Sequence, residues 1–287
     1  MHKIVVAHLK RFVAEHSLEN LDESKQFERF SNFCIAYKFY PARFDINCIT
    51  SEDDDAGIDG IAFIVDGELV TTPDEANDIF KRPKKNILVD IVFIQSKRSE
   101  KFDRGEILKF GDGVSEFLSD SPNLPQGEFN QNSKELFNTI IENVPKVAHG
   151  KPNSHLFYVT TATYGQEREL EATFKSIEQR LVESGFFKNV SFSPIDKDEL
   201  IKLWSSTWSG VEAKFEVKGY TPYPEISGIT QAYLAIVPAK NFVNSVLSDS
   251  EGKLRNFTFQ ENVRAFLGEE NHVNKMIQKT ILDESGK

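Results

Sequence analysis

The sequence contains few cysteines and no long apolar run. Cys34 and Cys48 are the only cysteines among its 287 residues, and they form no CxxC pair and have no histidine at zinc-ligand spacing. This pattern argues against a structural zinc site and fits a reducing cytoplasm. No segment reaches the roughly 18 consecutive apolar residues that span a bilayer, and residues 2–17 mix charged with apolar residues, unlike a signal peptide. We expect a cytoplasmic protein with no membrane partner.

The signatures of two enzyme classes are also missing. The sequence has no GxxxxGK[ST] phosphate loop, so a nucleotide-driven motor is not expected. Its histidines are scattered, and none has a partner at metal or triad spacing, which excludes a hydrolytic triad and leaves surface or capping roles. The histidines are His2, His8, His16, His149, His155 and His272.

Positive charge is in the minority. The 34 Lys and Arg residues stand against 44 Asp and Glu residues, for a formal net charge of −10. Sequence-independent DNA affinity comes from neutralising phosphates, so the chain is not expected to coat nucleic acid and any DNA contact must be local. Basic residues do cluster on both sides of the apolar run 87–94 and are expected to surround a site on that run, although a solvated surface explains each group equally well. They are Lys81, Arg82, Lys84 and Lys85 before the run and Lys97, Arg98, Lys101, Arg104 and Lys109 after it.

The spacing of apolar residues predicts an α/β fold with a mixed central sheet flanked by helices. Hydrophobic residues make up 39% of the chain and include 24 Phe, enough for a substantial core. The run 87–94 is apolar throughout, as in a strand buried on both faces. Helical spacing occurs at 4–13, 27–37, 107–118, from 132 to about 144, and at 167–183, and strand patterns occur at 58–70, 87–94, 156–161 and 190–192. Residues 58–70 read as a hairpin turning at Asp66 and Gly67, and residues 72–86 as a polar insertion.

A change of composition near residue 219 predicts two domains, 1–218 and 219–287. Residues 219–228 hold two prolines and two tyrosines and are the best candidate linker. Beyond them a strand near 232–237 and helices near 241–247, 260–267 and 273–282 indicate a smaller α+β segment.

A candidate site lies where two predicted strands meet. Asp59 stands at the start of the hairpin, and Gln95, Ser96 and Lys97 end the buried strand 87–94 and its continuation. Alternation along a strand places Gln95 and Lys97 on one face and Ser96 on the other, and neighbouring strands would bring them to Asp59. An acid, an amide oxygen and an ammonium would then share a pocket.

Such a pocket suits phosphodiester cleavage. The reaction needs a cation that neutralises charge in the transition state, and a deprotonated water held in line. Asp59 and the Gln95 amide oxygen would bind Mg²⁺ or Mn²⁺ with the backbone carbonyl of Ser96, because hard cations prefer oxygen ligands. Lys97 would orient the water and contact the phosphate. Asp90 falls on the opposite strand face from Gln95, which favours a structural role.

The order of these residues resembles the PD-(D/E)XK nuclease superfamily, in particular its Mrr-like branch. Gly57, Asp59 and Gly60 come first, a strand follows, and Gln95 and Lys97 come at its end. In that branch a Gln replaces the usual acid, so another acid should compensate. The resemblance implies a restriction-endonuclease-like core. It also implies a fourth site residue, Glu28, at the position of the helical Glu that this superfamily often uses as a further metal ligand. An exposed helix Glu is an equally good reading of Glu28.

A wider resemblance links the chain to AIPR proteins, named for abortive infection phage resistance. The residues that carry it are Gly57–Ala62, Gly67–Val70, Phe93–Lys97, Phe110–Val114, Ala232–Leu234, Phe257–Gly268, Val273 and Asn274. It implies a bacterial antiphage role through DNA cleavage, with residues 219–287 as the start of an AIPR-type domain. A homodimer would serve cleavage of both strands, although nothing in the sequence requires one.

Two other interpretations compete with a nuclease. Asp55, Gly57, Asp59, Gly60 and Asp66 fall at positions of an EF-hand loop, but position 3 lacks an oxygen side chain and position 12 is not Glu. The stronger rival is a catalytically inactive nuclease-like fold that binds protein or DNA. The neutral Gln95 and the acidic net charge support it, whereas an acid and a lysine converging on one strand end argue against it.

Overall fold

A computed structural model describes residues 2–52, 57–84, 86–124, 126–208, 213–224 and 231–248. The chain forms two compact units, residues 1–208 and residues 209–287. The acidic residues 53–55 and the helices predicted near 260–267 and 273–282 lie outside the described residues. No helix in the described ranges is both long and apolar enough to cross a membrane.

The first unit is built on a mixed sheet of five strands in the order β2-β1-β3-β4-β5. The strands are β1 (Gly60–Val65), β2 (Glu68–Val70), β3 (Val89–Lys97), β4 (Asn153–Thr160) and β5 (Val190–Ile195). Strand β1 runs antiparallel to both β2 and β3, whereas β3, β4 and β5 are parallel. The expected mixed α/β sheet is therefore confirmed. The apolar run 87–94 forms most of β3, the central strand of the sheet.

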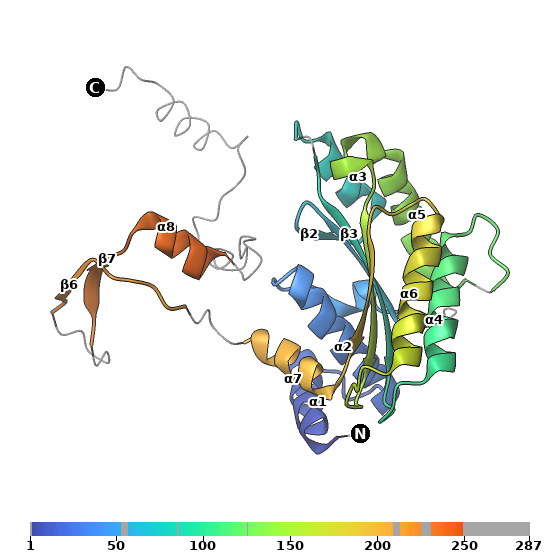
Figure 1. Cartoon of the computed structure of the whole chain (residues 1–287), viewed down its shortest axis with the longest axis horizontal. Helices are drawn as coiled ribbons and strands as arrows, with labels where there is room; N and C mark the ends of the chain where they lie inside the picture. The colour runs from blue at the N-terminus through green and yellow to red at the C-terminus, as the bar shows by residue number, and fades with distance from the viewer. Residues whose placement is uncertain are drawn as a thin grey trace. The chain divides into compact units, whose positions relative to one another are not determined.

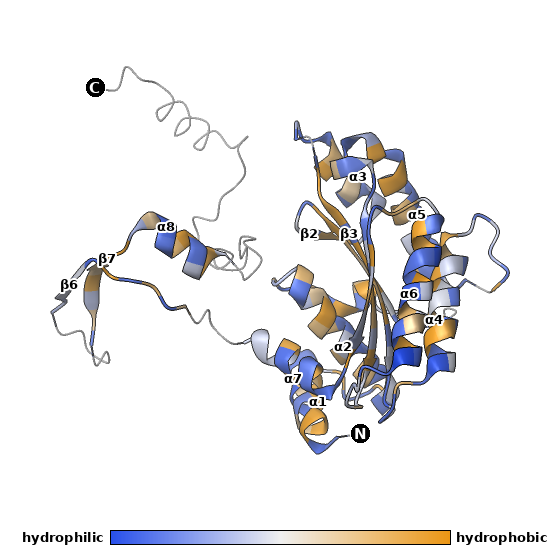
Figure 2. Cartoon of the chain, viewed as in Figure 1, coloured by the Kyte–Doolittle hydropathy of each residue, from blue (hydrophilic) through white to orange (hydrophobic). Residues whose placement is uncertain are grey.

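Helices cover both faces of this sheet and make three layers (Figure 1). One face carries α1 (Lys3–His16), α2 (Glu23–Phe39) and α7 (Lys197–Ser206), and the other carries α3 (Pro73–Lys81), α4 (Arg104–Leu118), α5 (Glu128–Glu142) and α6 (Arg168–Glu183). Each face has its own apolar core, so alternate residues of β3 enter different cores. Phe93 packs on the α4 side and Ile94 on the α2 side. In Figure 2 the sheet is the most hydrophobic layer.

Local sequence explains the elements next to the site. Asp66 and Gly67 have φ of 56° and 81° between β1 and β2, as a type I′ turn requires at both central positions. Helix α3 was missed, because residues 72–86 were interpreted as a polar insertion. Thr72 and Glu75 form a capping box, and Pro73 occupies the first helical position, so the start signal was present. Helix α7 was missed in the same way although Asp196 caps it.

Polar side chains tie together the first residues of the three parallel strands. Asp90 Oδ1 accepts hydrogen bonds from Asn153 Nδ2 at 3.0 Å and pairs with His155 Nε2 at 3.0 Å. The other ring nitrogen of His155, Nδ1, lies 2.9 Å from the Ser191 hydroxyl. The expectation of a surface or capping role is therefore wrong for His155, whereas the structural role expected for Asp90 is supported. This network lies at the opposite end of β3 from Gln95 and Lys97.

Asp90→Ala is expected to lower the free energy of unfolding by about 1–3 kcal/mol, because it leaves Asn153 and His155 without their acceptor. Chemical denaturation of the purified variant measures this loss. Any nucleic-acid cleavage by the folded variant should match that of the wild type, and a strong loss of cleavage would place Asp90 in the site.

The second unit contains a small antiparallel pair. Strand β6 (Gly219–Pro222) pairs with β7 (Tyr233–Ile236), followed by α8 (Ala239–Phe242) and a π-helical turn, Val243–Leu247. The strand predicted near 232–237 is present. The proposed linker 219–228 begins instead with β6, because Gly219 to Pro222 pair with Ile236 to Tyr233.

Candidate active site

Asp59 lies at the carboxyl end of β3. Gly60 pairs with Ile94 in the antiparallel register, and the Asp59 amide donates to the Ile94 carbonyl at 2.9 Å. This pairing places Asp59 beside Gln95. The expected meeting of Asp59 with the end of the buried strand is thus present in the structure.

The Asp59 carboxylate is the centre of a hydrogen-bond cluster. Gln95 Nε2 lies 3.0 Å from each carboxylate oxygen. The Ser96 amide and hydroxyl donate to Asp59 Oδ2 at 2.7 and 2.9 Å. Gln95 therefore presents its nitrogen to Asp59, and its oxygen would face a shared cation only with the amide turned over. Ser96 was expected to contribute its carbonyl, but it contacts Asp59 through its amide and hydroxyl.

Buried contacts fix the backbone at Asp59. Asn32 Nδ2, on α2, donates to the Asp59 carbonyl at 2.9 Å and to Thr50 Oγ1 at 3.0 Å. A Cβ at Gly60 would lie 2.5 Å from Asn32 Nδ2, closer than real Cβ contacts allow. Only glycine at position 60 lets α2 approach the strand this closely. The motif glycine is thus needed to position the acid.

Glu28 lies on α2, and its negative charge acts on the Asp59 carboxyl group. Its side chain is 14% exposed, so it is not a freely solvated helix Glu. Its Oε2 is buried, and the Lys25 ammonium pairs with it at 2.9 Å. A buried carboxylate oxygen is costly unless it is paired, and Lys25 now supplies the positive charge that a bound cation would otherwise supply.

The pKa of Asp59 reports on these surroundings. Burial, and after it the negative charge of Glu28, raise the pKa of Asp59 to about 6. The hydrogen bonds from Ser96 and the positive charge of Lys97 act in the opposite direction. Two carboxylates that repel each other in a partly dry site form a strong attractor for a divalent cation.

Lys97 faces an acid that the sequence analysis did not identify. Lys97 Nζ lies 3.6 Å from Glu106 Oε2, and Lys109 Nζ lies 2.7 Å from Glu106 Oε1. Asp103 caps α4 by accepting from the Glu106 amide at 3.0 Å. The Asp-x-x-Glu spacing predicts such a helix start. It could have pointed to Glu106, because α4 begins soon after the strand that bears Lys97.

Tyr158 is a second neighbour that sequence reasoning missed. It pairs with Gln95 in the parallel register of β3 and β4 and is 1% exposed. Burial raises its pKa, and so do the charges of Glu106, Asp103 and Asp59. The phenol therefore stays neutral beside the site.

The basic residues do not surround the site as expected. Lys84 pairs with Asp66 at 2.8 Å beside the hairpin turn, at the start of β3, roughly 26 Å of strand from its end. Residues that follow β3 do lie near the site, but most are already paired. Arg98 contacts Glu23, Arg104 Nε donates to Thr173 at 3.0 Å, and Lys109 pairs with Glu106.

The donors at this site fit magnesium or manganese better than zinc. In the described ranges no group of three or more His, Cys, Asp or Glu side chains gathers in metal-binding geometry. Asp59, Glu28 and the Gln95 amide offer two carboxylates and one neutral oxygen. Mg²⁺ commonly binds one or two protein carboxylates and keeps several waters, so this set is adequate.

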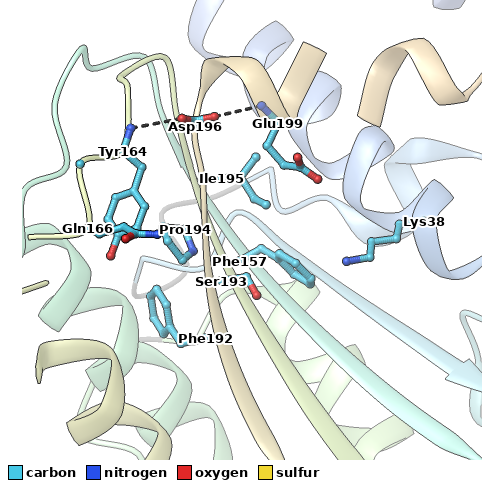
Figure 3. A pocket seen from close by; sticks show the side chains of 11 residues that line it. Lys38, Phe157, Tyr164, Gln166, Phe192, Ser193, Pro194, Ile195, Asp196 and Glu199 are labelled. Carbon is cyan, nitrogen blue, oxygen red and sulfur yellow. Dashed lines mark hydrogen bonds between the residues drawn. The ribbon is translucent and has the colours of Figure 1, made fainter. Parts of the chain in front are cut away.

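A cavity lies at a distance from Asp59, at the edge of the sheet. This cavity of about 690 Å³ wraps around β5, the edge strand two strands away from β3 (Figure 3). The edge itself is poorly suited to pair with another strand, because Glu178 accepts from the Phe192 amide at 2.7 Å and Pro194 has no amide hydrogen. None of the residues that line this cavity belongs to the cluster around Asp59.

Comparison of the chain with protein-family models, curated proteins and solved structures gives no match.

Proposed function

We propose that the chain is a metal-dependent phosphodiesterase that cleaves DNA, with a restriction-endonuclease-like core in residues 1–208. The observation that carries this proposal is the convergence of Asp59, Glu28, Gln95 and Lys97 at one end of β3. Asp59 contacts Gln95 at 3.0 Å, and its pKa responds to the charges of both Glu28 and Lys97. A scaffold has no need for two repelling acids and a lysine at one strand end.

Each side chain has a role in this proposal. Asp59, Glu28 and the Gln95 oxygen, turned toward the ion, would hold Mg²⁺ or Mn²⁺, with the Ser96 carbonyl nearby. The ion would neutralise the phosphate and promote deprotonation of a water. Lys97 is 39% exposed, so its ammonium can reach a phosphate and orient the attacking water. Glu106 holds that ammonium at the end of the strand.

The topology supports the proposed core. Strands β2, β1 and β3 form an antiparallel ribbon, and β3, β4 and β5 continue it in parallel. The carboxyl end of the central strand then carries the site, with α2 on one face and α4 on the other (Figure 1). The calcium-loop alternative fails here. Strand β1 separates Asp59 from Asp66 by roughly 20 Å.

The resemblance to AIPR proteins extends this proposal: the chain would be a cytoplasmic endonuclease that acts in antiphage defence. It would act as a homodimer if both DNA strands are cut. The rival is a binding module without activity. The ion pairs of Arg98 with Glu23 and of Lys109 with Glu106 favour that rival, because a cation paired with an acid contributes less to DNA affinity.

Incubation of the purified chain with supercoiled plasmid separates the two proposals. We expect nicking or linearisation with Mg²⁺ or Mn²⁺ and none with EDTA. Single-stranded DNA and RNA are tested in parallel to define the substrate. A folded protein inactive with every metal would favour the binding module, and cleavage that persists in EDTA would refute the metal-dependent mechanism.

A further inference from the structure

Lys25 places a positive charge at the acid pair. Its Nζ lies 2.9 Å from the buried Oε2 of Glu28. Burial lowers the pKa of Lys25, but its hydrogen bond to Glu28 and the charges of Glu28, Asp59 and Glu52 outweigh this and raise it. The ammonium is therefore within electrostatic reach of both acids that the proposed function assigns to a metal.

The charge of the helix end does not favour a lysine at this position. Asp22 caps α2 and accepts from the Ser24 and Lys25 amides at 2.8 and 3.0 Å. Lys25 is thus in the first turn, where the partial positive charge of the helix end disfavours a cation. Its benefit must come from the acids, because Glu28 and Asp59 otherwise repel each other.

In the ion pair of Lys25 and Glu28, only the Lys25 side chain is free enough to move away. The Lys25 side chain is 28% exposed, twice the exposure of Glu28. A long flexible stem at a helix start can turn its ammonium into water, whereas Glu28 is held on the buried side of the helix. An ammonium and a divalent cation cannot share one carboxylate oxygen without strong repulsion.

We propose that Lys25 is a displaceable counterion, which occupies the acid pair in the metal-free protein and competes with the divalent cation for it. This inference rests on the proposed function and adds a regulatory element to the same site. Lys25 therefore sets the metal concentration at which the site fills. Its role is distinct from that of Lys97, which acts on the water and the phosphate.

Titration calorimetry with Mn²⁺ alone, without nucleic acid, tests the proposal on the whole chain. We expect Lys25→Met to bind Mn²⁺ at least about tenfold more tightly than the wild type, because the competing charge is gone. Lys25→Arg keeps the charge and should stay near the wild-type affinity. Lys38→Met, in the last turn of the same helix, is the matched control and should change nothing. Lys25→Gln serves as a second neutral variant should the Met variant fail to fold.

The outcomes separate this inference from the proposed function. If the wild type binds Mn²⁺ and the neutral variants bind it with equal or weaker affinity, the proposed role of Lys25 is wrong, but the metal site remains supported. If only the neutral variants bind Mn²⁺, Lys25 is a strong competitor of the metal. Failure of wild type and neutral variants alike to bind Mn²⁺ overturns both proposals.

Discussion

Asp59→Asn is expected to make the protein more stable at neutral pH while removing its activity. Burial and the charge of Glu28 raise the pKa of Asp59 from 3.8 to about 6. The carboxylate is thus charged at pH 8 in a site that disfavours its charge. The difference between 6 and 3.8 corresponds to about 3 kcal/mol of unfolding free energy. An Asn can keep the Ser96 hydrogen bonds through Oδ1 and bond Gln95 once that amide turns over.

The pH dependence of the stability difference follows from the raised pKa of Asp59. A carboxyl group whose pKa is raised on folding stabilises the fold below its unfolded pKa, and that contribution is lost as the pH rises through the folded value. The stability difference between Asp59→Asn and wild type should therefore be near zero below about pH 4 and reach about 3 kcal/mol above about pH 7. Urea denaturation of both proteins across this range measures it in metal-free buffer.

Asp66→Asn is the matched control, because Asp66 lies at the other end of β1 and its positive φ suits Asn. We expect no comparable gain in stability and unchanged cleavage for this variant. Cleavage by Asp59→Asn should fall at least about 100-fold, as for loss of a main electrostatic group. A variant that is no more stable than wild type at pH 8 would show that Asp59 is not charged and strained in the metal-free site.

Lys97→Met is expected to lower the rate of cleavage by about 100-fold to 10,000-fold, the range typical of a group that positions or activates the attacking water. The side chain is 39% exposed, and it pairs at 3.6 Å with Glu106, whose side chain is 35% exposed. Its contribution to stability is therefore at most about 1 kcal/mol. Single-turnover cleavage and thermal unfolding are measured on the same preparation.

Lys101→Met controls for a general loss of positive charge, because Lys101 is exposed shortly after the same strand. It should reduce cleavage only slightly, and the reduction should shrink at high salt. Equal losses in both variants would mean that Lys97 contributes only to binding of the backbone, and full activity of Lys97→Met would remove it from the mechanism.

Much of the fold could be predicted from the sequence because strand burial leaves a strong pattern. The run 87–94 and the turn at Asp66 and Gly67 predicted β3 and the hairpin, and the strand alternation predicted that Gln95 and Lys97 share a face. Helix α3 was missed because its apolar residues, Ala76, Ile79 and Phe80, are few, and only its capping box marks it.

The site was predicted only in part, because the rest depends on how the helices pack. The charge of Glu28 acts on Asp59 because Asn32 and Gly60 allow α2 to lie close to β1. No pattern near Glu28 in the sequence reveals this electrostatic interaction. The position of Lys25 depends on the same packing, so it could not be assigned from spacing alone, whereas the Asp-x-x-Glu spacing did mark Glu106.

The proposed mechanism requires that β1, β3 and α2 together hold one divalent cation at Asp59. Anomalous diffraction from crystals grown or soaked with Mn²⁺ tests it most directly. We predict one strong peak about 2–2.5 Å from an Asp59 oxygen and within coordinating reach of Glu28 and the Gln95 oxygen. A peak at another place, with Asp59 still bonded to Gln95 Nε2, would contradict the account.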